Sequence, residues 1–277
     1  DVARHASDRL PISPASARLI HALVRPDWRA GELADIVRAD AALSERLLRA
    51  ANARRAPGSE PIDTIEQALV CVGPGLTLAL AVSEALREPF QADVPPYGLG
   101  TGVLWRHSIA AVLATEESAQ SCRFPIPPAA YAAALLHDAG KLVLGRYAEE
   151  ELLERLVDSA KLLGIGRGEA RTVVLEAFHA ELGALLVEAW GLSPLIAEAV
   201  RHHHAPLMAS DPAARRLCSQ ILLADSVAAL VGTPCGQGSP PAFDAALAGS
   251  LQISEASYAQ LVARVGDRLE SVLELYA

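Results

Sequence analysis

Apolar residues recur along most of the chain at the three- and four-residue spacing of helices with one buried face. The pair Ser13-Pro14 joins a helix N-cap to a proline at the first helical position, so a helix should follow it. In residues 191–194, a glycine that ends one helix is followed by a serine cap and a proline that begin the next. The expected helices cover residues 14–23, 27–39, 42–53, 63–72, 76–87, 105–121, 128–148, 150–164, 171–190, 194–204, 213–231, 243–251 and 254–275.

Two segments rich in proline and glycine separate these helices, residues 89–102 and 232–241. The first is expected to be a linker and the second a loop. They divide the chain into an N-terminal helical lobe (1–98), a helical core (99–231) and a C-terminal helical extension (232–277).

The composition points to the same fold class. Apolar residues make up 51% of the chain and aromatic residues only 4%, with alanine and leucine dominant, which favours an all-α protein. The formal net charge of −9 argues against a broad nucleic-acid surface, because binding to phosphates relies on clustered lysine and arginine.

Neither a membrane span nor a secretion signal is expected. Ser83 and Glu84 interrupt the apolar run 76–86, and the first residues lack the apolar segment of a signal peptide. The four cysteines are scattered without a CxxC pair, which favours free thiols in a reducing cytosol over disulfides or a zinc knuckle. We therefore expect a cytoplasmic protein with no nucleic-acid or membrane partner.

The polar pair His137-Asp138 lies in a strongly apolar stretch, where a buried helix is expected. A buried carboxylate must be paired or bound to a metal, and adjacent helical residues can both reach one ion beside the helix. Asp225 lies in a similar apolar segment with no lysine or arginine nearby in sequence. A metal ion between these three residues and His107 would offset the burial cost of both carboxylates.

Each candidate also has a simpler explanation. His107 could be an ordinary core or surface residue, and His179 could merely donate a hydrogen bond to a carbonyl. The run 202–204 ends a helix, where cations are favoured by the helix dipole. However, six of the eight histidines fall between 107 and 204, which favours a joint nitrogen and oxygen metal site. Lys141 follows His137 by one turn and could contact a phosphate or be a solvated lysine.

In this order, the candidate ligands resemble the pattern of the HD metal-dependent phosphohydrolase superfamily: His107, His137-Asp138, His179, His203-His204 and Asp225. The wider context is similar to the HDOD (HD-related output domain) branch, through segments 36–52, 62–73, 105–108, 134–142, 179–192 and 203–206. The resemblance spans residues 10 to 230.

The resemblance implies an all-α fold with an HD-type helical core, an N-terminal lobe and a C-terminal extension. It implies that His107, His137, Asp138 and Asp225 hold one divalent ion. A second ion would lie at His179 and at His203 or His204, with Asp138 bridging. The pattern does not distinguish Fe, Mn, Ni, Zn or Mg as the metal.

The resemblance also shapes the functional expectation. Ala41 stands where the family usually has proline, a local change. Residues 206–209 read Pro-Leu-Met-Ala in place of the Gly-Tyr-Pro element of HD-GYP cyclic-di-GMP phosphodiesterases, which argues against that activity. Many HDOD members lack metal residues and are viewed as bacterial signalling modules, whereas this chain keeps the whole ligand set.

We therefore expect a signal-transduction module that binds signalling proteins or a nucleotide-type ligand and has an intact metal site. The alternative is an active metal-dependent phosphohydrolase on a nucleotide or cyclic dinucleotide. A third interpretation, a helical domain with incidental histidines, leaves two buried carboxylates without partners.

Overall fold

The computed structural model describes residues 2–10, 12–25, 27, 29–56, 58–122, 125–147, 150–232, 235, 243 and 245–275. Over these residues the protein is all-α, as predicted, and its only β pairing is an isolated bridge between Val94 and Leu99. The elements in chain order are α1 (Val2–Arg9), α2 (Pro14–Val24), α3 (Ala30–Arg38), α4 (Ala41–Ala53), α5 (Ile65–Gln91), η1 (Pro95–Tyr97), α6 (Val103–Ser118), α7 (Pro128–Leu136), α8 (Ala139–Tyr147), α9 (Glu150–Ala160), η2 (Lys161–Leu163), α10 (Arg167–Ala189), α11 (Pro194–Arg201), η3 (Pro206–Met208), α12 (Pro212–Leu230), α13 (Ala245–Leu251) and α14 (Glu255–Leu275).

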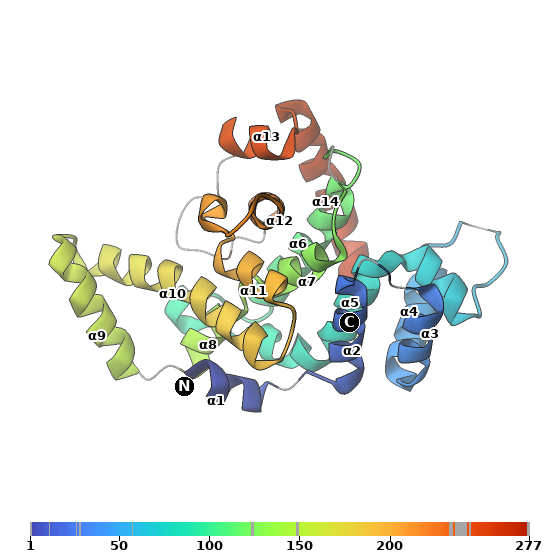
Figure 1. Cartoon of the computed structure of the whole chain (residues 1–277), viewed down its shortest axis with the longest axis horizontal. Coiled ribbons are helices and arrows are strands. Elements are labelled where there is room, and N and C mark those ends of the chain that lie inside the picture. Colours follow the sequence, from blue (N-terminus) through green and yellow to red (C-terminus); the bar gives the residue numbers. More distant parts are fainter. Residues whose placement is uncertain are drawn as a thin grey trace.

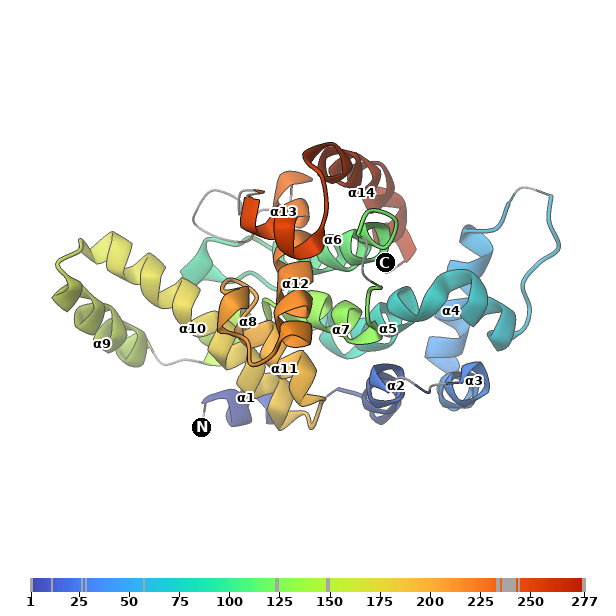
Figure 2. The same cartoon turned by 45° about the horizontal axis from the view of Figure 1, so that its top comes forward.

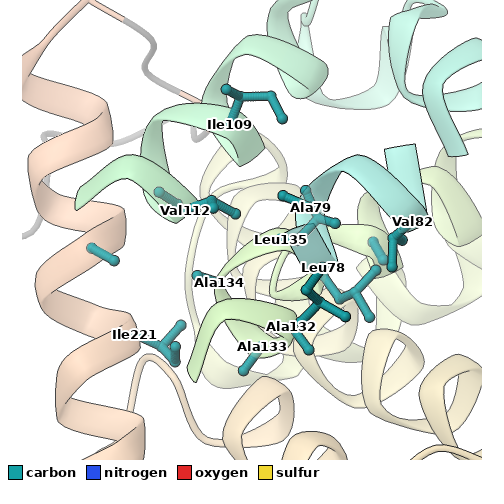
Figure 3. Packing of buried hydrophobic residues seen from close by; sticks show 14 of the residues in the cluster. Leu78, Ala79, Val82, Ile109, Val112, Ala132, Ala133, Ala134, Leu135 and Ile221 are labelled. Atoms are coloured by element: carbon teal, nitrogen blue, oxygen red, sulfur yellow. The ribbon is translucent and has the colours of Figure 1, made fainter. Parts of the chain in front are cut away.

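The molecule is elongated, with α3 and α4 at one end and α9 at the other (Figures 1 and 2). One continuous cluster of buried apolar residues runs through it. At its centre, side chains of α5, α6, α7 and α12 pack together, and the run Ala132–Ala134 lets α7 approach its neighbours closely (Figure 3). The fully buried members there include Leu78, Ile109, Leu135 and Ile221.

Several helix ends follow the predicted capping signals. The Oγ of Ser13 accepts a hydrogen bond from the backbone N–H of Ser16 at 3.0 Å, and Ser193 caps α11 in the same manner. The cap of α5 is Thr64 rather than the predicted Asp63, because the Thr64 hydroxyl accepts the N–H of Gln67. Helix α1 was not predicted, and it packs against α8 and α10.

The linker predicted at residue 89 begins later than expected. Helix α5 is broken at Gly73, as predicted, but continues through Pro89 to Gln91. A proline so close to a helix end removes only one hydrogen bond, and burial of the neighbouring Phe90 offsets that loss. The 3-10 helix η1 then follows, so the segment contains ordered structure.

Two predicted helices end earlier than expected, each next to a histidine. The helix predicted over 128–148 is interrupted at His137-Asp138, between α7 and α8, and α11 ends at Arg201 rather than at residue 204. At the ends of α7 and α11, a histidine side chain, and not a backbone N–H group, donates a hydrogen bond to a carbonyl of the last turn. The Nδ1–H groups of His137 and His203 donate to the carbonyls three residues before them, at 2.8 and 2.6 Å.

One helical stretch is longer and more apolar than expected for a chain with no predicted membrane span. Residues Ile65–Ser83 are long and apolar enough to cross a membrane by length and composition alone. However, 61% of that stretch is buried inside the protein, and the chain bends within it at Gly73. Its apolar character is therefore accounted for by the packing of the core.

The C-terminal helix is tied to α6 by ion pairs. The buried carboxylate of Glu117 accepts hydrogen bonds from Arg264, at 2.9 Å, and from Arg268. The neighbouring Glu116 pairs with Arg268 and with Arg54, the residue that follows α4, so this network joins α6 and α14 to the end of α4.

We expect Glu117→Ala to lower the free energy of unfolding by about 1–2 kcal/mol. Breaking a buried ion pair costs about 3–5 kcal/mol, but Arg264 and Arg268 are about a third exposed and can be rehydrated. The control is Glu270→Ala, which breaks an exposed ion pair to Arg106 between the same two helices. Urea unfolding should show no measurable change for the control, and equal losses in both variants would contradict the expectation.

Candidate metal centre

Seven predicted ligand side chains come together in the structure. Three of the helices near them, α10, α11 and α12, pack against one another in sequence near the middle of the molecule (Figure 2). The ligand side chains come from α6, the α7–α8 junction, α10, the turn after α11, and α12. The seven are His107, His137, Asp138, His179, His203, His204 and Asp225. Every residue that the sequence assigned to a metal site is thus in one cluster.

One group surrounds the Nε2 atom of His107. It lies 3.1 Å from His137 Nε2, 3.2 Å from Asp225 Oδ1 and 3.5 Å from Asp138 Oδ2. Ligands about 2.0–2.2 Å from one ion lie roughly 3.0–3.5 Å from each other in tetrahedral or octahedral coordination. These spacings therefore match those of ligands around a common ion.

A second group surrounds His179. Its Nε2 atom lies 3.4 Å from His203 Nε2, 3.2 Å from His204 Nε2 and 3.4 Å from Asp138 Oδ1. Asp138 therefore presents Oδ2 to the first group and Oδ1 to the second, as the bridging role requires.

Backbone carbonyls fix the orientation of three of the imidazoles. The Nδ1–H groups of His137, His179 and His203 donate to the carbonyls of Ala134, Leu175 and Val200, respectively. This is the arrangement by which metal-binding histidines are usually oriented, with Nε2 directed at the ion. The hydrogen bond considered as an alternative role for His179 is therefore present and compatible with metal binding.

Electrostatics keep both carboxylates ionised despite their burial. Burial opposes ionisation, but Lys141 and the imidazoles hold the pKa of Asp138 well below its usual value. Hydrogen bonds from His107 and His137 likewise hold the pKa of Asp225 well below its usual value against burial. Both carboxylates are thus available as anionic ligands.

The pKa values of the buried imidazoles shift in two directions. Burial lowers the pKa of His179 to about 3, and burial with the neighbouring His204 lowers that of His203 well below the usual value. Burial also acts against the charge on His137, but Asp138 and Asp225 raise its pKa. His179 and His203 therefore stay neutral with free Nε2 lone pairs, whereas the two carboxylates favour the protonated form of His137.

The buried Oδ1 atom of Asp138 has no hydrogen-bond partner among the described residues. The Nε2 atom of His179 lies 3.4 Å from it and carries no proton, because the proton is on Nδ1, which donates to the Leu175 carbonyl. Two acceptors facing each other in a buried site are unfavourable unless a cation lies between them. The donor set of imidazole and carboxylate groups fits a divalent transition metal.

Lys141 is buried, which rules out the solvated lysine considered from the sequence. Its Nζ atom donates to Asp138 Oδ2 and to the carbonyl of Cys235, both at 2.7 Å. Burial opposes the charge, but Asp138 keeps its pKa above the usual value. A phosphate contact from Lys141 stays a prediction.

Sequence reasoning missed two residues of this centre. Cys235 lies beside His107 and Asp138, and its position after α12 gave no signal. Tyr97, in the predicted linker, packs edge-on against His179 and donates its hydroxyl to the Leu175 carbonyl at 2.8 Å.

A glycine allows α8 and α10 to approach each other behind the cluster. A Cβ atom on Gly140 would lie 1.8 Å from the carbonyl oxygen of His179 and 2.6 Å from the backbone nitrogen of Gly183. Both obstacles are backbone atoms, so no side-chain rotation could relieve them. The placement of His179 next to Asp138 therefore depends on Gly140.

The cluster opens toward solvent at His204, whose side chain is 37% exposed. A groove of about 320 Å³ begins there and is lined mainly by apolar residues, among them Leu207, Leu222 and Leu247. A larger cleft of about 850 Å³ lies between α2, α3 and the start of α11, and contains none of the candidate ligands. The groove at His204 is thus the one relevant to the centre.

The family model for the HDOD domain matches residues 10–206. No curated protein sequence matches the chain at a significant level. Among solved structures, an HDOD domain protein of unknown function from Geobacter sulfurreducens has a TM-score of 0.69 at 21% identity, covering 99% of this chain and 96% of that one.

Two further structures share the fold. A candidate signal transduction protein from Marinobacter aquaeolei VT8 has a TM-score of 0.69 at 23% identity, over 98% of this chain but 60% of that one. A candidate phosphohydrolase from Shewanella amazonensis SB2B has a TM-score of 0.63 at 20% identity, over 99% and 98%. At these identities the likeness extends to the fold alone.

Proposed function

This chain belongs to the HDOD domain family. We propose that it is a signal-transduction module regulated by divalent metal in its HD-type centre. The observation that carries this proposal is the unpartnered Oδ1 atom of Asp138 inside a closed set of imidazoles. The module would act by binding a signalling protein or a nucleotide-type ligand. The candidate signal transduction protein among its structural neighbours supports this direction.

The residues divide into two sets around Asp138. His107, His137 and Asp225 would hold one ion with Oδ2, and His179, His203 and His204 would hold a second with Oδ1. The chemistry supplied by such bound ions is Lewis acidity toward phosphoryl oxygens. The chain itself orients three of the imidazoles through backbone carbonyls, and burial of most of the ligands limits the access of water.

Burial of the centre favours regulation over turnover. Four of the five histidines are 0% exposed and Asp138 is 1% exposed, so a substrate would have to enter past His204. The complete ligand set nevertheless supports a second function, hydrolysis of a nucleotide or cyclic-dinucleotide phosphoester. Release of nitrophenol from bis-p-nitrophenyl phosphate by the metal-loaded protein would favour hydrolysis. A metal-loaded protein with no turnover would favour the regulatory module.

Asp138→Ala is expected to remove most of the bound metal, because it deletes the carboxylate shared by both sets of ligands. The measurement is elemental analysis of protein purified without chelator or a histidine tag, with Fe, Mn, Ni, Zn or Mg expected at one to two ions per chain. Asp158→Ala is the matched control, since that aspartate is exposed on α9. Unchanged metal in Asp138→Ala would show that the ligand assignment is wrong, and an empty parent protein would refute metal binding.

A further inference from the structure

A thiol lies against the first group of ligands. Cys235 follows α12, beyond the residues matched by the family model, and is 3% exposed. Its Sγ atom, a ring nitrogen of His107 and a carboxylate oxygen of Asp138 all lie within 4.8 Å of one another. Cysteine, histidine and aspartate together form a mixed sulfur, nitrogen and oxygen donor set.

We propose that Cys235 is a thiolate ligand of the ion held by His107, His137, Asp138 and Asp225, and that it makes this site selective for thiophilic metals such as zinc. The inference rests on the proposed metal binding. Thiolate ligands favour zinc and similar ions over magnesium and manganese, which prefer oxygen donors. With Cys235 among its ligands, the site would bind fewer kinds of metal than the imidazole and carboxylate ligands alone would bind.

The backbone at Cys235 is anchored to the same carboxylate. Lys141 donates from one ammonium group to the Cys235 carbonyl and to Asp138 Oδ2, each at 2.7 Å. Nitrogen and sulfur ligands of one zinc ion lie roughly 3.5–3.8 Å apart, given bond lengths of about 2.0 and 2.3 Å. Atoms that lie at most 4.8 Å apart therefore need to approach by no more than about 1.0–1.3 Å to share the ion.

Cys235 would bind the ion as a thiolate, with the thiol proton leaving to solvent as the metal–sulfur bond forms. Burial holds the pKa of the free thiol well above its usual value, so the proton leaves only when the ion binds.

The ordinary alternative is that Cys235 is a small core residue. Cobalt(II) distinguishes the two roles, because a thiolate bound to cobalt gives a charge-transfer absorption band in the near ultraviolet. Titration of the metal-free whole chain with cobalt chloride should produce this band. Cys235→Ser should lose the band while elemental analysis still finds bound cobalt, and Cys218→Ser, a buried control outside the centre, should keep it.

Loss of the band through misfolding of Cys235→Ser is controlled for by a variant that keeps Cys235. With serine at Cys71, Cys122 and Cys218, the protein should still develop the band, and its absence there would overturn the proposal. Cobalt bound to the parent protein without the band would overturn thiolate ligation and leave the metal centre standing. No bound cobalt in the parent protein would overturn both.

Discussion

Replacing Gly140 with alanine is expected to destabilise the protein by about 3 kcal/mol or more and to reduce metal binding. In most helices this change would stabilise by about 1 kcal/mol, because alanine has the higher helix propensity. Here the new Cβ would meet the backbone of α10 at His179 and Gly183, so α8 and α10 must separate. That separation moves His179 away from Asp138, so stability and metal content should fall together.

The matched control is Gly168→Ala. Gly168 also lies in a helix, α10, but a Cβ there meets no atom within 4 Å. Urea unfolding should show a stability equal to or slightly above that of the parent protein, with unchanged metal content. A Gly140→Ala protein as stable as this control would mean that α8 and α10 do not pack as closely as described.

Lys141→Met is expected to destabilise the metal-free protein by about 3 kcal/mol, and the metal-loaded protein by much less. Removing one member of a buried ion pair leaves the other charge uncompensated, and the Asp138 side chain is 1% exposed. A bound ion supplies the missing positive charge at the same carboxylate. Zinc should therefore raise the thermal melting temperature more in this variant than in the parent protein.

The control for this prediction is Lys161→Met. Lys161 pairs with Asp158 at the same three-residue spacing and at 2.8 Å, but both side chains are exposed. Its melting temperature should match that of the parent protein with and without zinc. If zinc raised all three melting temperatures equally, the ion would not lie beside Asp138.

The sequence predicted the helices well where one apolar stripe determines them, and less well where a side chain ends a helix. The break between α7 and α8 is an example, because the stretch around His137 is apolar on both sides. What interrupts it is a hydrogen bond from the imidazole to the Ala134 carbonyl, which competes with the regular backbone pattern. Periodicity carries no information about such a bond.

The candidate ligands were predictable for a different reason. Buried aspartates are costly alone, so Asp138 and Asp225 indicated partners even before a structure. Cys235 and Tyr97 could not be found in this way, because neither carries a charge whose burial would require a partner. Their roles depend on contacts across the fold, such as the hydrogen bond from Lys141 to the Cys235 carbonyl, 94 positions along the chain.

The bend at Gly73 determines where the two halves of α5 make their contacts. Before it, the Cys71 thiol donates to the Ala51 carbonyl of α4, and after it Leu78 packs in the core beside Leu135 of α7. One helix thus spans from α4 to the helices around the metal centre without a spacer. Gly73, with φ of 79° and ψ of 163°, is the single non-helical residue along it. Because this positive φ favours glycine, the direction taken by the second half of α5, and with it the contacts of Leu78, depends on glycine at position 73.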